Sequence, residues 1–367
     1  MERLRAQQGA GGPVLQTAEG SHRQAVTAWN RHVAGATLLV DTSFLGDVLC
    51  AEPLVRAAAA RFGGPVDFLT SPGGAQVLAG HPDIREILIF DKRGQDRGLD
   101  GLRRCAARLR AHGYVRALCS HRSWRSAALL WMARIPERIG FRNASAAWLY
   151  TQRVRYPGER HEIERNLELA GGGAWERPRM HPSGEERARA AALAPETPFV
   201  VLAPGSLWAT KRWPAAHYAE TARALVRDGI ACVLLGGPED AALCRQVAEA
   251  AGVPVVDLCG QTTLRESCAV LERAAALVTN DSAPMHLGVA AGVPVVAVYC
   301  STVPEFGFAP RGPRDVILEV SGLACRPCGI HGRQACPEGH FRCGRETPAA
   351  AVLAALRSRM GSPDGAA

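Results

Sequence analysis

Apolar, β-branched runs alternate with helical stretches over most of the chain, and this alternation restricts the possible folds more than any other feature. In the first half, residues 36–42, 66–69, 86–90 and 116–119 have the pattern of strands, with helical stretches between them. Strands separated by helices pair in parallel, because each return crossover needs about the length of a helix. The first half therefore predicts a parallel α/β sheet.

A second block of the same kind follows a connector. Residues 171–198 contain three consecutive glycines, several prolines and one charged helical stretch, which is typical of an interdomain connector. Further strand patterns follow at residues 199–203, 231–235, 255–258, 276–279 and 293–299. Two doubly wound domains in tandem leave a cleft at the carboxyl ends of both sheets, where ligands of open α/β sheets bind.

The domain limits follow from composition. Residues 1–35 are mostly polar and rich in glycine and glutamine, so we expect a disordered extension. We assign residues 36–185 to the first Rossmann-like domain, 196–345 to the second, and 346–367 to a carboxyl-terminal helix and tail. No apolar run approaches the roughly 20 residues that cross a bilayer, and the first residues lack the apolar core of a secretory signal. We expect a cytoplasmic protein.

Gly46 and Asp47 follow the first strand pattern. Gly46 permits a sharp turn out of the strand, and Asp47 stands at the start of the next helix, above the sheet edge. A carboxylate at this position faces the cleft. The alternative is that Asp47 only caps its helix, by accepting hydrogen bonds from first-turn amides.

Ser206, Lys211 and Arg212 belong to the loop after the first strand of the second block. Two adjacent cations at the carboxyl end of a strand suit a diphosphate, because Lys211 offers a compact charge and Arg212 a planar fork. The alternative is a solvated pair on the surface.

Residues 279–287 have the layout of an anion site. A strand ends, a turn of small residues follows, and Pro284 marks the first turn of a helix. The free amides of that turn, the helix dipole and the Ser282 hydroxyl can hold phosphate oxygens. Asp281 and His286 are alternatively a turn former and an ordinary helix histidine.

Glu239 follows a similar turn, after two glycines. Its carboxylate can accept hydrogen bonds from ribose hydroxyls, or it can cap its own helix.

The chain has 12 cysteines. A reducing cytosol keeps thiols free, so we expect no disulfide framework. Cys232, Cys259 and Cys300 lie in or beside apolar runs and are expected to pack as small hydrophobes. Four others form a cluster: Cys325, Cys328, Cys336 and Cys343. Four thiolates this close can bind one structural zinc or iron ion, and free thiols are the alternative.

The formal net charge of +8 favours acidic partners, namely a nucleotide sugar, an anionic membrane surface with its glycolipid, or nucleic acid. An arginine-rich composition without functional meaning is the alternative. Basic residues are dispersed and aromatic residues are few, so we expect no nucleic-acid binding.

Five segments occur in an order and spacing that resembles the lipopolysaccharide heptosyltransferases of glycosyltransferase family 9. They are SFLGDVLCAEPLVRA at 43–57, RIGFR at 138–142, KRWP at 211–214, LCGQTTLRE at 258–266 and TNDSAPMHLGVAAGVPVVAVY at 279–299. The similarity covers roughly residues 36–355, and the KRWP and NDS-P-MH patterns are most similar to the heptosyltransferase II branch. The resemblance implies a GT-B fold, transfer with inversion, ADP-L-glycero-D-manno-heptose as donor and heptosyl-Kdo2-lipid A as acceptor.

The resemblance also implies roles for individual residues. Asp47 matches the general base of the family, and Lys211 matches the residue that neutralises the leaving diphosphate. The other residues of the predicted donor site are Ser206, Arg212, Glu239, Asp281, Ser282, Ala283 and His286. The family usually has Gly at the position of Ala283 and Ala at that of Gly288, so the diphosphate approaches a methyl group here.

The resemblance implies no metal or other cofactor for catalysis, which agrees with the lack of an Asp-x-Asp motif. One autotransporter-modifying branch resembles this chain in carrying an iron-binding cysteine element. Arg122, Arg125 and Arg138 are candidates to contact a phosphorylated glycolipid at the inner face of the inner membrane. Alternatives are another heptosyltransferase branch, including one that modifies proteins, and a GT-B sugar-nucleotide epimerase. Nothing in the sequence predicts the oligomeric state.

Overall fold

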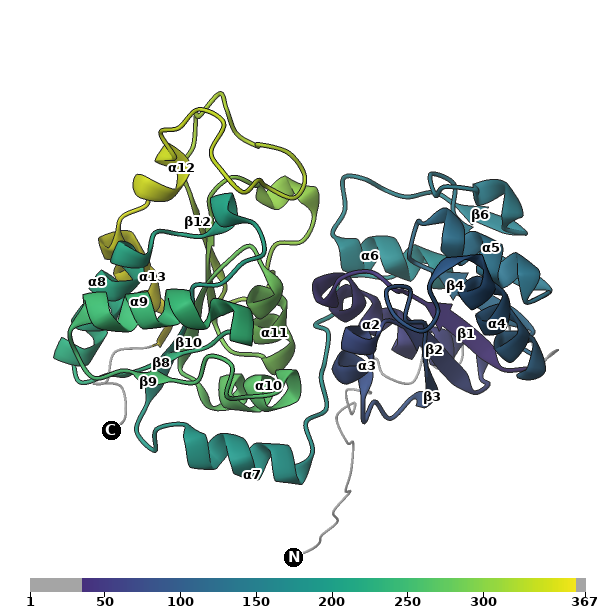
Figure 1. The fold of residues 1–367 in the computed structure, drawn as a ribbon, viewed down its shortest axis with the longest axis horizontal. Helices are drawn as coiled ribbons and strands as arrows, with labels where there is room; N and C mark the ends of the chain where they lie inside the picture. The colour runs from purple at the N-terminus through teal and green to yellow at the C-terminus, as the bar shows by residue number, and fades with distance from the viewer. Residues whose placement is uncertain (1–34, 361–367) are drawn as a thin grey trace, which may run out of the picture.

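The protein folds into two lobes, each built on a six-stranded parallel sheet, as a computed structural model shows (Figure 1). The structure describes residues 35–360. The predicted extension therefore lies outside the described residues, apart from residue 35. The predicted fold class, two doubly wound α/β domains of GT-B architecture, is confirmed.

The first sheet has the strand order β3-β2-β1-β4-β5-β6. Its strands are β1 (Thr37–Val40), β2 (Val66–Thr70), β3 (Ile84–Ile89), β4 (Arg116–Cys119), β5 (Glu137–Phe141) and β6 (Gln152–Val154). Its helices are α2 (Leu45–Phe62), α3 (Pro72–Leu78), α4 (Gly98–Ala111), α5 (Trp124–Met132) and α6 (Glu162–Leu167), with the 3-10 helices η1 (Ala147–Leu149) and η2 (Glu168–Ala170). The chain adds β2 and β3 on one side of β1 and then returns to place β4 on its other side. The topological switch point therefore lies between β1 and β4.

Side chains of β1 alternate between two cores, because successive residues of a strand point to opposite faces. Leu38 and Val40 pack with the apolar residues of α4, α5 and η1. Leu39 packs with those of α2 and α3. The outer layer of α4, α5 and η1 thus lies on the opposite face of the sheet from α2.

The second sheet has the order β12-β11-β10-β7-β8-β9, so its switch point lies between β7 and β10. Its strands are β7 (Phe199–Ala203), β8 (Ala231–Leu234), β9 (Val256–Asp257), β10 (Ala276–Asn280), β11 (Val295–Tyr299) and β12 (Val316–Glu319). The helices are α7 (Gly184–Leu193), α8 (Ala215–Arg227), α9 (Ala241–Ala251), α10 (Leu264–Arg273), α11 (Ala283–Ala291), α12 (Arg342–Arg345) and α13 (Ala349–Met360), with the 3-10 helices η3 (Ala209–Lys211), η4 (Pro238–Asp240) and η5 (Pro304–Phe306).

Two helices near the predicted domain limits pack on the second domain. Helix α7 lies against α10 (Figure 1), and Arg187 pairs with Glu272 at 2.8 Å. The predicted limit at residue 185 falls inside this helix. Helix α13 packs against α8 and three strands of the sheet, so the carboxyl-terminal helix completes the second domain.

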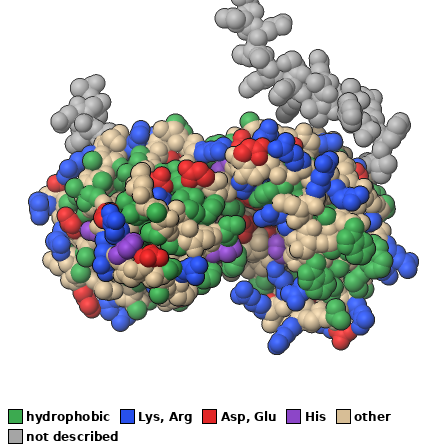
Figure 2. All heavy atoms as spheres, turned by 90° about the horizontal axis from the view of Figure 1, so that it is seen from above, with side chains coloured by type: hydrophobic (Ala, Val, Ile, Leu, Met, Phe, Trp, Pro, Cys, Tyr) green, Lys and Arg blue, Asp and Glu red, His purple; other side chains and the backbone are tan. Residues whose placement is uncertain are grey.

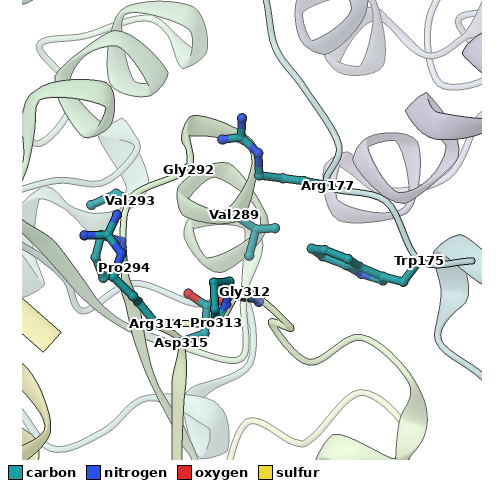
Figure 3. Close-up of a pocket in the computed structure, with 10 residues that line it drawn as sticks. All are labelled: Trp175, Arg177, Val289, Gly292, Val293, Pro294, Gly312, Pro313, Arg314 and Asp315. Atoms are coloured by element: carbon teal, nitrogen blue, oxygen red, sulfur yellow. Dashed lines mark hydrogen bonds between the residues drawn. The ribbon is translucent and has the colours of Figure 1, made fainter. Parts of the chain in front are cut away.

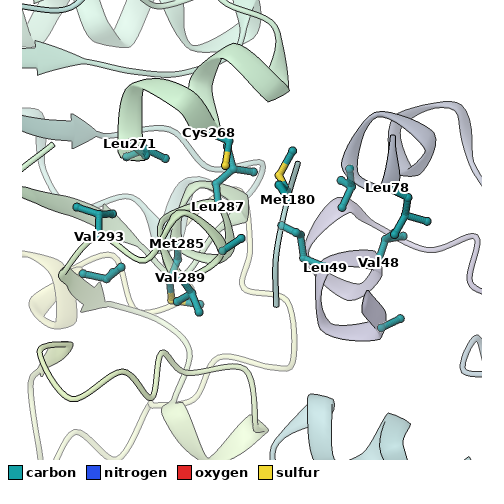
Figure 4. Packing of buried hydrophobic residues seen from close by; sticks show 14 of the residues in the cluster. Val48, Leu49, Leu78, Met180, Cys268, Leu271, Met285, Leu287, Val289 and Val293 are labelled. Atoms are coloured by element: carbon teal, nitrogen blue, oxygen red, sulfur yellow. The ribbon is translucent and has the colours of Figure 1, made fainter. Parts of the chain in front are cut away.

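One hydrophobic core joins the two domains. Met180 of the connector lies between Leu49 of α2 and Leu287 of α11 (Figure 4), and all three are buried. Helices α2 and α11 are also in direct contact. The domains therefore share apolar surface that each would expose alone.

Two expectations from the sequence are wrong. Gly46 lies inside α2 and is not among the residues with a positive φ, so no sharp turn requires it. Cys259 is bonded to Cys244, with their Cα atoms 6.6 Å apart, rather than packing as a free thiol. Helix α9 and the end of β9 lie side by side, which brings these two sulfurs together. Cys232 and Cys300 are buried free thiols as expected.

Candidate active site

Carboxylates gather at the switch point of the first sheet. Asp41 follows β1, and its carboxylate accepts hydrogen bonds from the Ser43 amide at 2.9 Å and the Ser120 hydroxyl at 2.6 Å. Ser120 follows β4, so Asp41 joins the loops after the two central strands. These loops form one continuous edge.

Asp47 lies in the first turn of α2, beside this edge. Its Oδ2 accepts a hydrogen bond of 3.3 Å from the Phe44 amide, so the carboxylate does cap its helix. Burial, with the charges of Asp41 and Glu162, raises the pKa of Asp47 to about 7. A carboxyl group with this pKa can accept a proton near neutral pH, so capping and general-base chemistry are compatible.

Gly46 makes a close approach between the two domains at this edge. A methyl group on Gly46 would lie 2.6 Å from Cδ2 of His286, which belongs to α11 of the second domain. The Cys50 sulfur lies 3.9 Å from Nδ1 of the same ring. Gly46 is thus needed for its small size, and the contact places Asp47 next to the first turns of α11.

A cation and a carboxylate meet at the carboxyl edge of the second sheet. Lys211 Nζ lies 2.7 Å from Oδ2 of Asp281, which also accepts a 2.7 Å hydrogen bond from the Thr302 hydroxyl. Burial lowers the pKa of His286 to about 4, and Lys211 acts in the same direction while Asp281 opposes it. The His286 imidazole is therefore neutral at physiological pH.

The start of α11 offers amides to an anion. The Ser282 hydroxyl donates to the Gly205 carbonyl at 3.1 Å instead of capping the helix. Between residues 35 and 360, no backbone or side-chain acceptor takes the amide protons of Ser282 and Ala283. These two amides therefore point to an anion site, as the sequence predicts, whereas the hydroxyl holds the loop after β7.

The remaining donor candidates lie around the same edge. Arg212 Nε donates to the Ser206 carbonyl at 2.8 Å, so part of its guanidinium shapes the loop after β7. Ser206 is buried, and its hydroxyl accepts a hydrogen bond of 3.4 Å from the Trp208 amide. Glu239 is exposed in η4, past the end of β8, while Asp240 accepts the Gly237 amide at 3.2 Å. Glu239 is free to meet a ligand.

The three acceptor candidates are not together. Arg122 follows β4 at the carboxyl edge and lies 4.3 Å above the Tyr156 ring. Arg125 lines a cavity of about 140 Å³ with Lys92 and Trp124. Arg138 lies near the start of β5, away from that edge, and its guanidinium donates to the carbonyls of Ile135 and Leu149. The RIGFR segment is therefore strand up to Phe141.

A second cavity, of about 320 Å³, lies at the other end of α11 (Figure 3). Trp175 and Arg177 of the connector extend over this end of the helix, near Val289 and Gly292. The cavity is separated from Ser282 by the length of α11, so it is not part of the candidate active site.

The four-cysteine loop packs against η3. Thr210 exchanges hydrogen bonds with the backbone of Arg333, and its hydroxyl donates to Ser301 at 3.0 Å. The Cys325 sulfur lies 3.9 Å from Nε2 of His340. Burial raises the pKa of Cys343 to about 11, and the thiols of Cys328 and Cys336 add to this.

The donor chemistry of this loop suits zinc or iron. Among the described residues, however, no three of these thiols come within 4.8 Å of one another, so the loop is not closed around one ion. We assign no step of the reaction to a metal.

Two residues near the site were not among those predicted to form it. Glu162 of α6 faces the site, since its charge raises the pKa of Asp47, and it accepts hydrogen bonds from Tyr156 at 2.6 Å and Arg165 at 2.9 Å. Asn280 bridges the loops after β7 and β10, donating to the Pro204 carbonyl and accepting from the Trp213 amide. The signals for Asn280 in the sequence were its place at the end of a strand and its membership of the NDS pattern.

Comparisons with known proteins show what this chain is similar to. Lipopolysaccharide heptosyltransferase 2 of Salmonella typhimurium is 27% identical over 293 residues, covering 73% of this chain and 84% of that protein. Lipopolysaccharide heptosyltransferase 1 of Pseudomonas aeruginosa is 28% identical over 308 residues, covering 79% and 85%.

The structure of E. coli ADP-heptose LPS heptosyltransferase II shares the fold, with a TM-score of 0.73, 24% identity, and coverage of 89% of this chain and 98% of that one. The family model of glycosyltransferase family 9 (heptosyltransferase) matches residues 102–337, more than half of the chain. Asp47 precedes the matched range, so its assignment rests on the geometry above. The chain is a glycosyltransferase, and it belongs to glycosyltransferase family 9.

Proposed function

We propose that this enzyme transfers L-glycero-D-manno-heptose, with inversion, from ADP-heptose to heptosyl-Kdo2-lipid A at the cytoplasmic face of the inner membrane. One observation carries the proposal. The contact between Gly46 and His286 places a carboxylate of the first domain beside a helix start and a lysine of the second. Such an arrangement has an acceptor side and a donor side.

On the acceptor side, Asp47 takes the proton of the attacking hydroxyl. Its raised pKa supports this role, because a base works best when its pKa is close to the operating pH. The negative charges of Asp41 and Glu162 disfavour the ionised form of Asp47, and this keeps the pKa of Asp47 high.

On the donor side, Lys211 and the amides of Ser282 and Ala283 neutralise the leaving diphosphate. Asp281 holds the Lys211 ammonium group at the start of α11, where the helix dipole acts in the same direction. Cations and amides then perform the task that a divalent metal performs elsewhere, so transfer proceeds without one.

The test measures ADP release from ADP-heptose with three acceptors: none, heptosyl-Kdo2-lipid A, and Kdo2-lipid A. We expect release with heptosyl-Kdo2-lipid A, with a matching gain of one heptose in mass. Preference for Kdo2-lipid A would assign the chain to the heptosyltransferase I type. This type is the second candidate, because lipopolysaccharide heptosyltransferase 1 of Pseudomonas aeruginosa is 28% identical to this chain. No release with either lipid would contradict the proposal.

A further inference from the structure

Three large aromatic side chains are exposed on the outer layer of the first domain. Trp124 and Trp131 of α5 are 46% and 57% exposed, and Trp148 of η1 is 75% exposed. Trp124 and Trp131 are seven positions apart, so they lie on one side of α5, and η1 is in contact with this helix. We call these three residues the tryptophan face.

The segment that carries this face is rich in positive charge. Residues 121–155 contain seven arginines and a single acidic residue, Glu137, which is paired with Arg116 at 2.6 Å. The exposed arginines are Arg122, Arg125, Arg134, Arg142, Arg153 and Arg155. Figure 2 shows hydrophobic side chains gathered on the lobe of the first domain, with Lys and Arg side chains nearby. The segment therefore combines exposed indole rings with an excess of positive charge, in which Arg155 is paired with Glu159 at 3.4 Å.

We propose that the tryptophan face and its arginines bind the surface of an anionic phospholipid bilayer. Tryptophan prefers the interface between water and hydrocarbon, because its ring is apolar and its N–H remains hydrated. Each arginine near an anionic leaflet adds about 1 kcal/mol to the free energy of binding, which is a factor of about five in the partition coefficient. Among the described residues, no helix is long and apolar enough to span a bilayer.

The position of this face agrees with a lipid-linked acceptor. Arg122 and Arg125, at the start of α5, lie at the same carboxyl edge as Asp41. A bilayer against α5 would thus present the head of a glycolipid to the edge that carries Asp47. The inference goes beyond the proposed function, because the face would bind lipid whichever sugar is transferred.

The test measures co-sedimentation of the full chain with phosphatidylglycerol vesicles and with phosphatidylcholine vesicles. We expect binding to the anionic vesicles, weakened about tenfold by Trp131→Ser/Trp148→Ser and restored by Trp131→Phe/Trp148→Phe. Arg134→Gln/Arg153→Gln should weaken the partition coefficient about 30-fold. Ile330→Ser and Arg227→Gln/Arg273→Gln, at exposed sites of the second domain, are the matched controls and should leave binding unchanged.

Activity separates this inference from the proposed function. The tryptophan variants should keep full ADP release with a deacylated, soluble acceptor and lose it with an acceptor embedded in vesicles. Vesicle binding by a chain that transfers no heptose would overturn the function and leave the surface standing. The surface assignment fails if neither vesicle binds, or if the controls weaken binding as much as the variants. It also fails if the tryptophan variants leave vesicle binding unchanged and alter only the oligomeric state of the protein or its binding to RNA.

Discussion

The two domains share one topology but carry opposite chemistry at equivalent edges. In both sheets the loops after the two central strands meet at the switch point. The first domain places Asp41 and Asp47 there, whereas the second places Lys211 and the start of α11. The same scaffold thus supplies a base for the nucleophile on one side and positive potential for the leaving group on the other. Each of the following predictions tests this division.

Replacing Asp47 tests the acceptor side most directly. Asp47→Asn keeps the size of the side chain but removes the base, so kcat should fall about 10³-fold. ADP affinity, measured by calorimetry, should stay the same. Asp83→Asn, an exposed carboxylate of the same domain, is the control and should retain activity. An active Asp47→Asn enzyme would end the assignment of a base to the first domain.

Replacing Lys211 tests the donor side. Lys211→Met removes the cation that Asp281 holds, so kcat/KM should fall about 10²- to 10³-fold and ADP binding should weaken. Lys211→Arg should recover part of the loss. If Lys211→Met bound ADP as tightly as the wild type, the diphosphate would lie elsewhere.

Gly46 tests whether the two edges must be this close. The methyl group of Gly46→Ala would meet the His286 ring, so the edges must separate and activity should fall about 10²-fold. Gly184→Ala, whose methyl group meets nothing within 4 Å, is the control. Full activity of Gly46→Ala would show that the contact is not needed for the reaction.

The pH profile tests the state of Asp47. With a pKa of about 7, the base is protonated in acid, so kcat/KM should fall about tenfold per unit below pH 7 and level off above it. A profile that is flat between pH 5.5 and 8 would contradict the role of this carboxylate.

The same group also changes stability, with a defined sign. Folding raises the pKa of Asp47 from 3.8 to about 7, so the folded state keeps a proton that the unfolded chain releases. The contribution of Asp47 to the free energy of unfolding is most favourable below pH 3.8 and is lost as the pH rises through 7. Asp47→Asn should therefore stabilise the protein at pH 8 by about 1 to 3 kcal/mol relative to its effect at pH 4. Thermal unfolding at both pH values measures the difference.

Chelation should have the smallest effect. If cations and amides replace a catalytic metal, EDTA should change kcat by less than about twofold. Metal analysis of the same sample tests the cysteine loop separately, with Cys325→Ser/Cys336→Ser as the variant that loses any bound zinc or iron. Loss of activity in EDTA with recovery in Mg²⁺ would contradict the proposed division between the domains.

The sequence predicts the central strands better than the edges. The limits of β4 and β7 were predicted to the residue, because buried strands of parallel sheets are almost entirely apolar. Strands β5, β6 and β12 were missed. Strands β6 and β12 are edge strands that pair on one side only and remain partly exposed, and β5 begins with Glu137 and Arg138, so the residues of all three lack that pattern.

The site was predictable where topology determines it. Asp47, Lys211 and Asp281 follow central strands, and such loops always meet at one edge of the sheet. The role of Gly46 was not predictable, because the His286 ring that it accommodates is 240 residues away in the sequence and in the other domain. The position of Arg138 was not predictable either, because β5, which carries it, begins with charged residues and lacks the apolar pattern of a buried strand.

The Met180 contact has a consequence for dividing this protein. Leu49, Met180 and Leu287 lie in one continuous core. Cutting the chain at the connector would therefore leave two fragments that each expose an aggregation-prone apolar surface. Replacing one domain with that of a relative, without changing the side chains that contact it, would therefore disrupt this core. A chimaera that takes its donor half from another enzyme must bring matching side chains on α2 and at residue 180.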